Sequence, residues 1–211
     1  MSGATPTGGS VTPIGPAIPT PAVGEPASRP ARTPEVFTAA VDGMLRAQVR
    51  AEITIEPMRA PTRLAPWAHA IGADVRDDSG EEIATGRLVL LYDPEGAEAW
   101  DGQFRLVAYA SAEMDAAIGA DPLLPQVGWS WLIEALQSRQ AGYRAAGGTV
   151  TQTTSTRFGD LHGPRTSVAL ELRGSWTALD PDLEPHVLAF ADLLSAAAGL
   201  PPEGVSPLAR P

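Results

Sequence analysis

Residues 71–93, IGADVRDDSGEEIATGRLVLLYD, decide the fold. Apolar and polar residues alternate from Ile71 to Val75, which gives the start of this stretch one apolar face, as in a half-buried strand. The DDSG segment at 77–80 holds residue types that favour tight turns, and an apolar run from Ile83 to Tyr92 then returns. The stretch therefore predicts a β-hairpin, and with it an antiparallel sheet.

The segments on either side of this hairpin predict one helix and two further strands. Apolar residues recur at helical spacing across 33–48, with Thr33 as the expected N-cap and Pro34 at the first helical position. Residues 51–56 (AEITIE) and 103–111 (QFRLVAYAS) alternate as strands do. In the second of these strands one face carries Phe104, Leu106 and Ala108, and the other carries Val107 and Tyr109.

The C-terminal half predicts a helix, two strands and a final helix. Helical spacing runs from Trp129 to Tyr143 and is expected to end at AAGG. Strands are expected at 149–158 (TVTQTTSTRF) and 166–176 (TSVALELRGSW), around a GDLHGP turn. Residues 180–202 predict a helix whose apolar side is formed by Leu183, Val187, Phe190 and Leu194. Gly199 and Pro201 are expected to end it.

The expected order of elements is α-β-β-β-β-α-β-β-α. Strands that come in blocks with tight turns, rather than alternating strictly with helices, predict an α+β fold, an antiparallel β-sheet packed against helices. We expect a single domain over residues 33–202. Residues 1–32 hold seven of the 21 prolines and predict a disordered N-terminal tail, and 203–211 predict a short C-terminal tail.

The composition excludes several kinds of chemistry. The chain has no cysteine, lysine or asparagine, so it has no thiol nucleophile, thiolate metal site, Schiff-base lysine or N-glycosylation site. We expect no cofactor. The net charge of −10 disfavours nucleic-acid binding, which depends on Arg and Lys replacing the counterions of phosphates. No apolar run or N-terminal pattern indicates a membrane span or a secretory signal, so a cytoplasmic location is expected.

The segment GWSWL sets Ser130 between two tryptophans, but it does not predict a catalytic serine. A nucleophile elbow needs G-x-S-x-G, and Leu132 stands where the second glycine would be. We interpret Ser130 as a cap or first-turn residue of a helix. Trp129 shares the apolar face of that helix and is expected in the core. Trp131 lies about 200° away, either half-buried under a loop or in a contact surface.

The three histidines do not predict a metal site. His69, His162 and His186 form neither H-x-x-H nor H-E-x-x-H. We expect His162 to be a solvated turn residue and His186 to be a neutral residue near a helix start. The acidic runs RDDSGEE and YDPEGAEAWDG lack the spacing of a calcium loop and are interpreted as turns.

Two further polar features leave alternatives open. The threonines of TVTQTTST could line a polar groove or occupy the wet face of a strand. Arg59, Arg63 and Arg76 could hold an anionic ligand or could pair with the abundant carboxylates.

Six segments carry a family resemblance: RLAPWAHAIGADV, ATGRLVLLYDPEGAEAWDGQFRLVAYASAEMD, DPLLPQVGWSWLIEAL, AAGGTVTQTTSTRFG, ELRGSWTA and LLSAAAGLPP. Together they resemble an actinobacterial family known as the domain of unknown function 3000. The resemblance implies no catalytic residues, since that family has no established activity. Its members are often encoded near a ribonuclease-D-like exonuclease, which implies a link to RNA metabolism.

The expected order of elements also resembles that of type III secretion chaperone-like domains, with one additional strand here. That resemblance implies a dimeric or partner-binding module without enzymatic activity, although a fold does not by itself determine a function.

Three functions remain open. The first is a non-enzymatic, cytoplasmic protein-binding or scaffold module with an unknown protein partner or self-association, for which Trp131 and Trp100 are the candidate interface residues. The second is a small-molecule-binding protein or a cofactor-free enzyme that uses His, Asp, Glu or Arg. The third is an accessory factor linked to RNA metabolism, which the net charge disfavours.

Overall fold

The computed structural model describes residues 32–119, 121–160 and 166–202. Apart from Arg32, both predicted tails lie outside these residues. The elements are α1 (Glu35–Arg46), β1 (Ile53–Met58), β2 (Trp67–Arg76), β3 (Glu82–Ala97), the 3₁₀ turn η1 (Glu98–Trp100), β4 (Gly102–Met114), α2 (Ala116–Gly119), α3 (Leu124–Ser138), β5 (Tyr143–Thr156), β6 (Thr166–Ala178) and α4 (Glu184–Ala197). The predicted order is confirmed, and η1 and the single turn α2 are added to it.

The six strands form one antiparallel sheet in the order β1-β2-β3-β4-β6-β5. The hairpin that the sequence predicts forms the second and third strands of this sheet, with Ile71 opposite Leu88 and Val75 opposite Ala84. The carboxylate of Asp77 closes the turn by accepting hydrogen bonds from the backbone N–H groups of neighbouring residues. The predicted α+β class is therefore confirmed.

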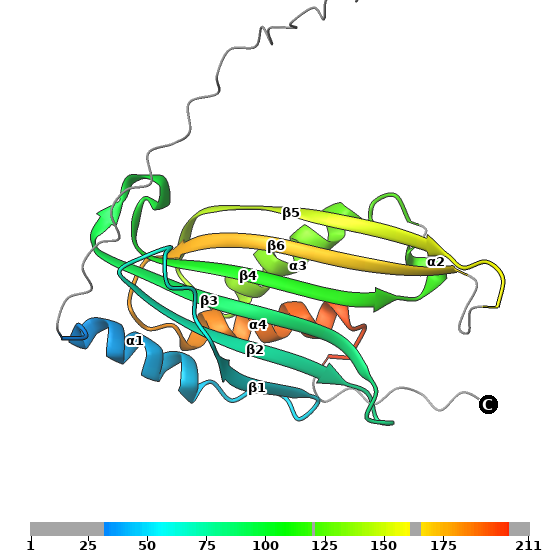
Figure 1. Ribbon diagram of the computed structural model, residues 1–211, viewed down its shortest axis with the longest axis horizontal. Helices are drawn as coiled ribbons and strands as arrows, with labels where there is room; N and C mark the ends of the chain where they lie inside the picture. The colour runs from blue at the N-terminus through cyan, green and yellow to red at the C-terminus, as the bar shows by residue number, and fades with distance from the viewer. Residues whose placement is uncertain (1–31, 120, 161–165, 203–211) are drawn as a thin grey trace, which may run out of the picture.

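Helices α3 and α4 lie behind the sheet in Figure 1, and α1, at the lower left, contacts α4. Helix α4 approaches the sheet most closely at Gly86 of β3. A Cβ atom at that position would lie 2.7 Å from Cζ of Phe190 and 2.9 Å from Cδ2 of Leu194. The absence of a side chain therefore sets how close the helix can lie.

A chain of aromatic rings attaches α1 to the same face. The ring centroids of Phe37 and Trp67 are 6.1 Å apart, those of Phe37 and Tyr92 are 5.9 Å apart, and those of Tyr92 and Phe104 are 4.6 Å apart. Offset ring pairs at these distances add stability beyond the area they bury. Phe37 is buried, as the helical spacing of 33–48 predicts.

The start of α1 differs from the prediction. The helix begins at Glu35, and Pro34 occupies the N-cap position with an extended backbone and no capping side chain, so Thr33 is not the N-cap. A proline also disfavours the helical backbone in the residue before it, which explains why the helix does not begin earlier. The stop of α4 is confirmed, because Gly199 has a positive φ of 66° and donates a hydrogen bond to the carbonyl of Ala196.

The boundary between α3 and β5 also differs from the prediction. Helix α3 ends at Ser138, so Gln140 and Tyr143 are not part of it, and AAGG belongs to strand β5. A Cβ atom at Gly148 would collide with the carbonyl oxygen of Arg173 and the ring of Trp129. The glycine therefore marks a close approach of backbone and ring within a strand, not the end of a helix.

The segment after Tyr92 is more regular than expected. The sequence predicts a turn-rich link, whereas β3 continues to Ala97 and η1 follows. The register of β3 and β4 shifts between Tyr92 and Ala97.

Candidate functional site

The face of the sheet opposite the helices carries no helix in the described part of the chain (Figure 1). Side chains alternate along each strand, so the residues that do not point at the helices point to this face. We call it the open face. It is formed by Thr54, Glu56 and Met58 of β1, Gly72 and Asp74 of β2, Thr85, Arg87 and Val89 of β3, Arg105, Val107 and Tyr109 of β4, Glu171, Arg173 and Ser175 of β6, and Thr149, Thr151 and Thr153 of β5.

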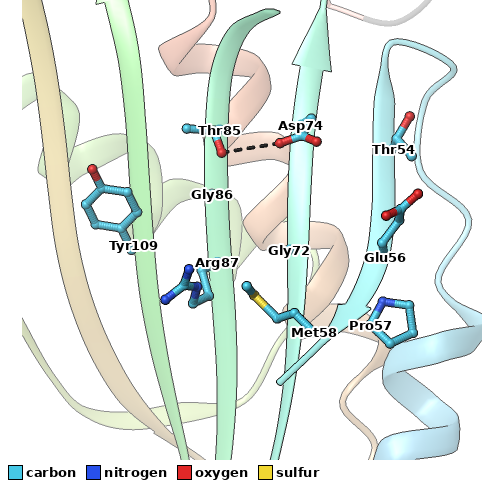
Figure 2. Close-up of a pocket in the computed structure, with 10 residues that line it drawn as sticks. All are labelled: Thr54, Glu56, Pro57, Met58, Gly72, Asp74, Thr85, Gly86, Arg87 and Tyr109. Atoms are coloured by element: carbon cyan, nitrogen blue, oxygen red, sulfur yellow. Dashed lines mark hydrogen bonds between the residues drawn. The ribbon is translucent and has the colours of Figure 1, made fainter. Parts of the chain in front are cut away.

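A hollow of about 270 Å³ lies on the open face over the first four strands. Figure 2 shows Arg87 in it between Tyr109 and Met58, with Glu56 at the far side. Gly72 has no side chain, and this leaves the space; a Cβ atom there would already be 3.6 Å from Sδ of Met58. The lining is completed by Thr54, Pro57, Asp74, Thr85 and Gly86.

The charged groups of the hollow are only partly satisfied. Thr85 donates a hydrogen bond to Oδ1 of Asp74 over 3.3 Å. Arg87 and Glu56 are exposed, and neither forms a hydrogen bond or ion pair with a described residue. The hollow thus holds one guanidinium and one carboxylate that are free to meet groups of another molecule.

A mutually satisfied cluster forms the wall beside the hollow. The hydroxyl of Tyr109 donates to Oε1 of Glu171 over 3.2 Å, and Nη2 of Arg173 lies 2.8 Å from Oε2 of the same carboxylate. The guanidinium carbon of Arg173 is also 5.7 Å from the centroid of the Tyr109 ring. These contacts hold the Tyr109 ring in place.

Arg105 connects three strands at the edge of the open face. Its guanidinium donates to the hydroxyls of Thr177 and Ser175 over 3.1 Å and 2.6 Å, and to the carbonyl of Ala145 over 2.9 Å. Burial lowers the pKa of Arg105. These contacts join β4 to β6 and to the start of β5.

Aliphatic side chains lie in a row beside the hollow. Val89, which is half-buried, is directly opposite Val107, whereas Ala70, opposite Val89, is fully buried. Val107 is 37% exposed although it belongs to a central strand of the sheet. The open face therefore combines an apolar row with a charged and aromatic one, and the alternation in 103–111 already places Val107 and Tyr109 together.

Ser130 is placed away from this face. It lies in the second turn of α3, not at its cap or in its first turn, because the helix begins earlier, at Leu124. Its hydroxyl donates to the carbonyl of Val127 over 2.9 Å. The hydroxyl therefore bonds to its own helix, as serines within helices commonly do.

The histidines lie on separate elements. His186 is buried in the first turn of α4, and burial lowers its pKa to about 4, which agrees with the predicted neutral residue. Nε2 of His69 on β2 is buried without a hydrogen-bond partner among the described residues, and burial lowers its pKa. His162 lies outside the described residues. Within the described ranges, no group of three or more His, Asp or Glu side chains is arranged to hold a metal ion.

The two candidate interface tryptophans lie on different elements. Trp131 is half-buried in α3 and packs against the hydrophobic core, and its neighbour Ala135 is buried. Trp100 is half-buried at the end of η1, where its carbonyl accepts a hydrogen bond from Thr177. Trp129, expected in the core, is also half-buried. A contact role for Trp131 and Trp100 stays a prediction.

The three arginines singled out in the sequence differ in their partners. Arg76 pairs with Glu82 at 3.8 Å, which confirms the expected pairing with a carboxylate. Arg59 and Arg63 are exposed and have no such partner among the described residues. They do not reach the hollow, which Arg87 occupies instead. The sequence contains no motif that distinguishes Arg87, since it is one polar residue in an alternating strand.

Comparison with known proteins gives the chain a family. The family described as "Protein of unknown function (DUF3000)" matches residues 33–206. The chain belongs to this family. The resemblance seen in the sequence is thus confirmed, and the described DUF3000 domain is the α+β unit above. No curated protein and no solved structure matches the chain. The likeness to type III secretion chaperones therefore remains a prediction.

The helices give one further finding. In the described ranges of this DUF3000 protein, none of them has the combination of length and apolar character that crossing a membrane requires.

Proposed function

We propose that this protein is a non-enzymatic binding module that holds another protein on its open face. The observation that carries the proposal is the exposed Val107 at the centre of the sheet, next to Tyr109 and the free Arg87. Protein interfaces combine an apolar centre with a polar rim, and Tyr and Arg are enriched in them. The proposal includes a cytoplasmic location, which rests on the sequence-based expectation.

The chemistry of the open face suggests what the partner offers. Val89 and Val107 would contact an apolar ridge, and Arg87 would meet a carboxylate, because a guanidinium that is desolvated in an interface needs an anionic or carbonyl acceptor. Glu56 on the other side of the hollow would meet a basic or amide group. Tyr109, already fixed by Glu171, would contribute a rigid aromatic surface.

Small-molecule binding in the hollow is the second candidate. It is favoured by the free Arg87, which suits a small anion. It is disfavoured by the volume of about 270 Å³, which is slightly below the ~300–1,000 Å³ typical of ligand pockets. An anion that raises the melting temperature of the wild type but not of Arg87→Gln would support it.

Photocrosslinking tests the main proposal. A benzophenone amino acid is placed at Val107 in the full chain within its native cells, and a matched control is placed at Leu45 of α1, which is 50% exposed. We expect a defined crosslinked protein from position 107 and none from position 45. Val107→Asp should abolish recovery of that protein in affinity purification, whereas Leu45→Asp should not. Equal crosslinking from both positions would refute a binding role for the open face.

A further inference from the structure

We propose that two copies of this chain pair edge to edge along β5, so that their two sheets join into one continuous antiparallel sheet. This inference goes beyond the proposed function and does not rest on it, because it concerns the edge of the sheet and not its open face.

Strand β5 is a long edge strand that is paired on one side. It has 14 residues and is the last strand in the sheet order, with β6 as its neighbour. From Gly147 to Thr156 it keeps one register with the residues from Ser175 to Thr166. The outward backbone N–H and C=O groups of this regular stretch have no strand beside them in the described part of the chain, and such a row is a template for pairing.

The opposite edge of the sheet is protected, and β5 is not. Strand β1 has six residues and contains Pro57, which cannot donate a hydrogen bond to a neighbouring strand. Strand β5 has a bulge, where the register shifts between Arg144 and Gly147, but it lies at the start of the strand. The stretch after the bulge has no proline and no further irregularity that would prevent pairing.

The composition of β5 suits a second copy of the same chain. From Ala145 to Thr156 there is no charged residue, although the whole chain carries a net charge of −10. Two copies that each carry this net charge repel one another, and the uncharged stretch of β5 adds nothing to that repulsion. Threonine is also one of the residues that strands favour.

A two-fold axis perpendicular to the sheet gives a consistent register. It keeps the side-chain faces of the two copies aligned, so Thr149, Thr151 and Thr153 of one copy would lie beside the same row of the other. Threonines directly opposite each other are a favourable cross-strand pair. The same axis sets both open faces on the same side of the joined sheet, which would give two binding surfaces that point in one direction.

Helix α3 holds the edge in position from behind. The ring of Trp129 packs on Gly148, where a Cβ atom would lie 2.8 Å from Cζ3 of the indole. Gln152 donates a hydrogen bond to the carbonyl of Gly119 in α2. The strand is therefore ordered before a second copy arrives, which reduces the entropy lost on pairing.

An unrelated extended peptide fits this edge less well than a second copy. Strand-addition sites gain their specificity from pockets for alternate side chains of the peptide. The open-face row of β5 instead consists of short hydroxyl side chains at Thr149, Thr151, Thr153 and Ser155. Another copy of β5 matches this row in length, charge and side-chain size.

The test is sedimentation of the full chain carrying a charge at the centre of the edge. Thr151→Lys and Thr151→Asp each place like charges near the two-fold axis, and Thr54→Lys makes the same change on the exposed face of β1 as a control. We expect the wild type to sediment at twice 22.0 kDa. Each Thr151 variant should raise the dimer Kd about tenfold or more, and Thr54→Lys should leave it unchanged.

Mixing the two Thr151 variants provides the decisive test. An equimolar mixture of Thr151→Lys and Thr151→Asp should form a mixed dimer, because opposite charges then meet across the axis. Far-UV circular dichroism establishes that each variant is folded, and the pair Thr153→Lys and Thr153→Asp repeats the test if one is not. A monomeric wild type, a dimer that resists both Thr151 variants, or a mixture that stays monomeric would each overturn the proposal. None of these results bears on crosslinking from Val107, so the two proposals fail separately.

Discussion

Nε1 of Trp176 donates a hydrogen bond to Nδ1 of His186 over 3.1 Å, and both side chains are buried. A ring nitrogen that accepts a hydrogen bond carries no proton, so this contact between β6 and α4 requires a neutral imidazole. Burial lowers the pKa of His186 to about 4, against the opposing effect of the carboxylates of Asp180 and Asp182.

The first prediction is that acid destabilises the fold through His186. The pKa of histidine is about 6.5 in an unfolded chain, and that of His186 in the folded chain is about 4. Between these values the unfolded chain binds a proton that the folded chain does not bind. The free energy of unfolding therefore rises with pH in this window. The contribution of His186 is fully present above about pH 6.5, and near pH 4 the free energy of unfolding is lower by about 3 kcal/mol than it is there. Urea denaturation between pH 5 and 7 measures the slope.

Two variants separate this effect from other titrating groups. His186→Gln keeps an acceptor for Trp176 but does not titrate, so the slope above pH 5 should become smaller. Burial also lowers the pKa of His69, so His69→Gln is the matched control and should retain most of the slope. Carboxylates whose pKa is lowered in the folded chain also affect stability. Glu52, with a pKa of about 2, loses its contribution to the free energy of unfolding only as the pH falls below the range of this measurement. An unchanged slope in His186→Gln would contradict the assignment.

The second prediction concerns the close approach of α4 to the sheet. Gly86→Ala should lower the free energy of unfolding by about 1–3 kcal/mol, because the new methyl group would overlap the side chains of Phe190 and Leu194. Gly147→Ala is the matched control, since a Cβ atom there meets nothing within 4 Å. Thermal denaturation of both variants measures the difference. Equal melting temperatures of the two variants would show that α4 can shift away from the sheet without loss of stability.

Much of this fold can be predicted from the sequence because the decisive signals are local. The hairpin follows from alternation over 71–93, and the faces of β4 follow from the spacing of Phe104 and Val107. The boundary between α3 and β5 cannot be predicted in the same way. AAGG has the composition of a helix end, and only the approach of Trp129 and Arg173 from distant parts of the chain explains Gly148 as a strand residue.

The candidate site was predictable only in part, for a similar reason. The sequence shows that Val107 and Tyr109 share a face, but it does not show that this face lacks a helix. The contact of Tyr109 with Glu171 spans 62 residues of sequence, and local spacing carries no information about it. That Arg87 has no partner in the described ranges depends on what surrounds it in three dimensions. From the sequence alone, Trp131 stands out instead, because of its residue type.

The third prediction tests whether Trp131 stabilises the fold or serves a contact. Its ring is half-buried against the core, so Trp131→Ala should lower the free energy of unfolding by about 1–2 kcal/mol, less than the ~3–5 kcal/mol of a fully buried aromatic. Trp176→Ala, which removes a fully buried tryptophan, should lower the free energy of unfolding by the larger amount. Urea denaturation compares the two. An unchanged stability together with weaker self-association would assign Trp131 to a contact surface.

The fourth prediction concerns the ion pair that joins α3 to α4. Nε and Nη2 of Arg139 lie 2.6 Å and 2.7 Å from the two carboxylate oxygens of Asp192, a two-point contact between side chains that are 37% and 35% exposed. Two-point geometry strengthens an ion pair, and solvent exposure weakens it. A double-mutant cycle of Arg139→Ala and Asp192→Ala should give a coupling free energy of about 0.5–1 kcal/mol, which decreases at high salt.

Another ion pair of the same chain provides the comparison. Arg76 and Glu82 lie 3.8 Å apart, with side chains that are 53% and 48% exposed, and this longer contact should give a coupling near zero in the same cycle. The cycle removes contributions that each residue makes with other neighbours, which matters for Arg139 because it also takes part in other interactions. If both pairs coupled equally, geometry would not decide the strength of ion pairs on this surface. If neither coupled, the packing of α3 against α4 would rest on apolar contacts such as Leu136 with the core, and salt would leave the stability of the helix pair unchanged.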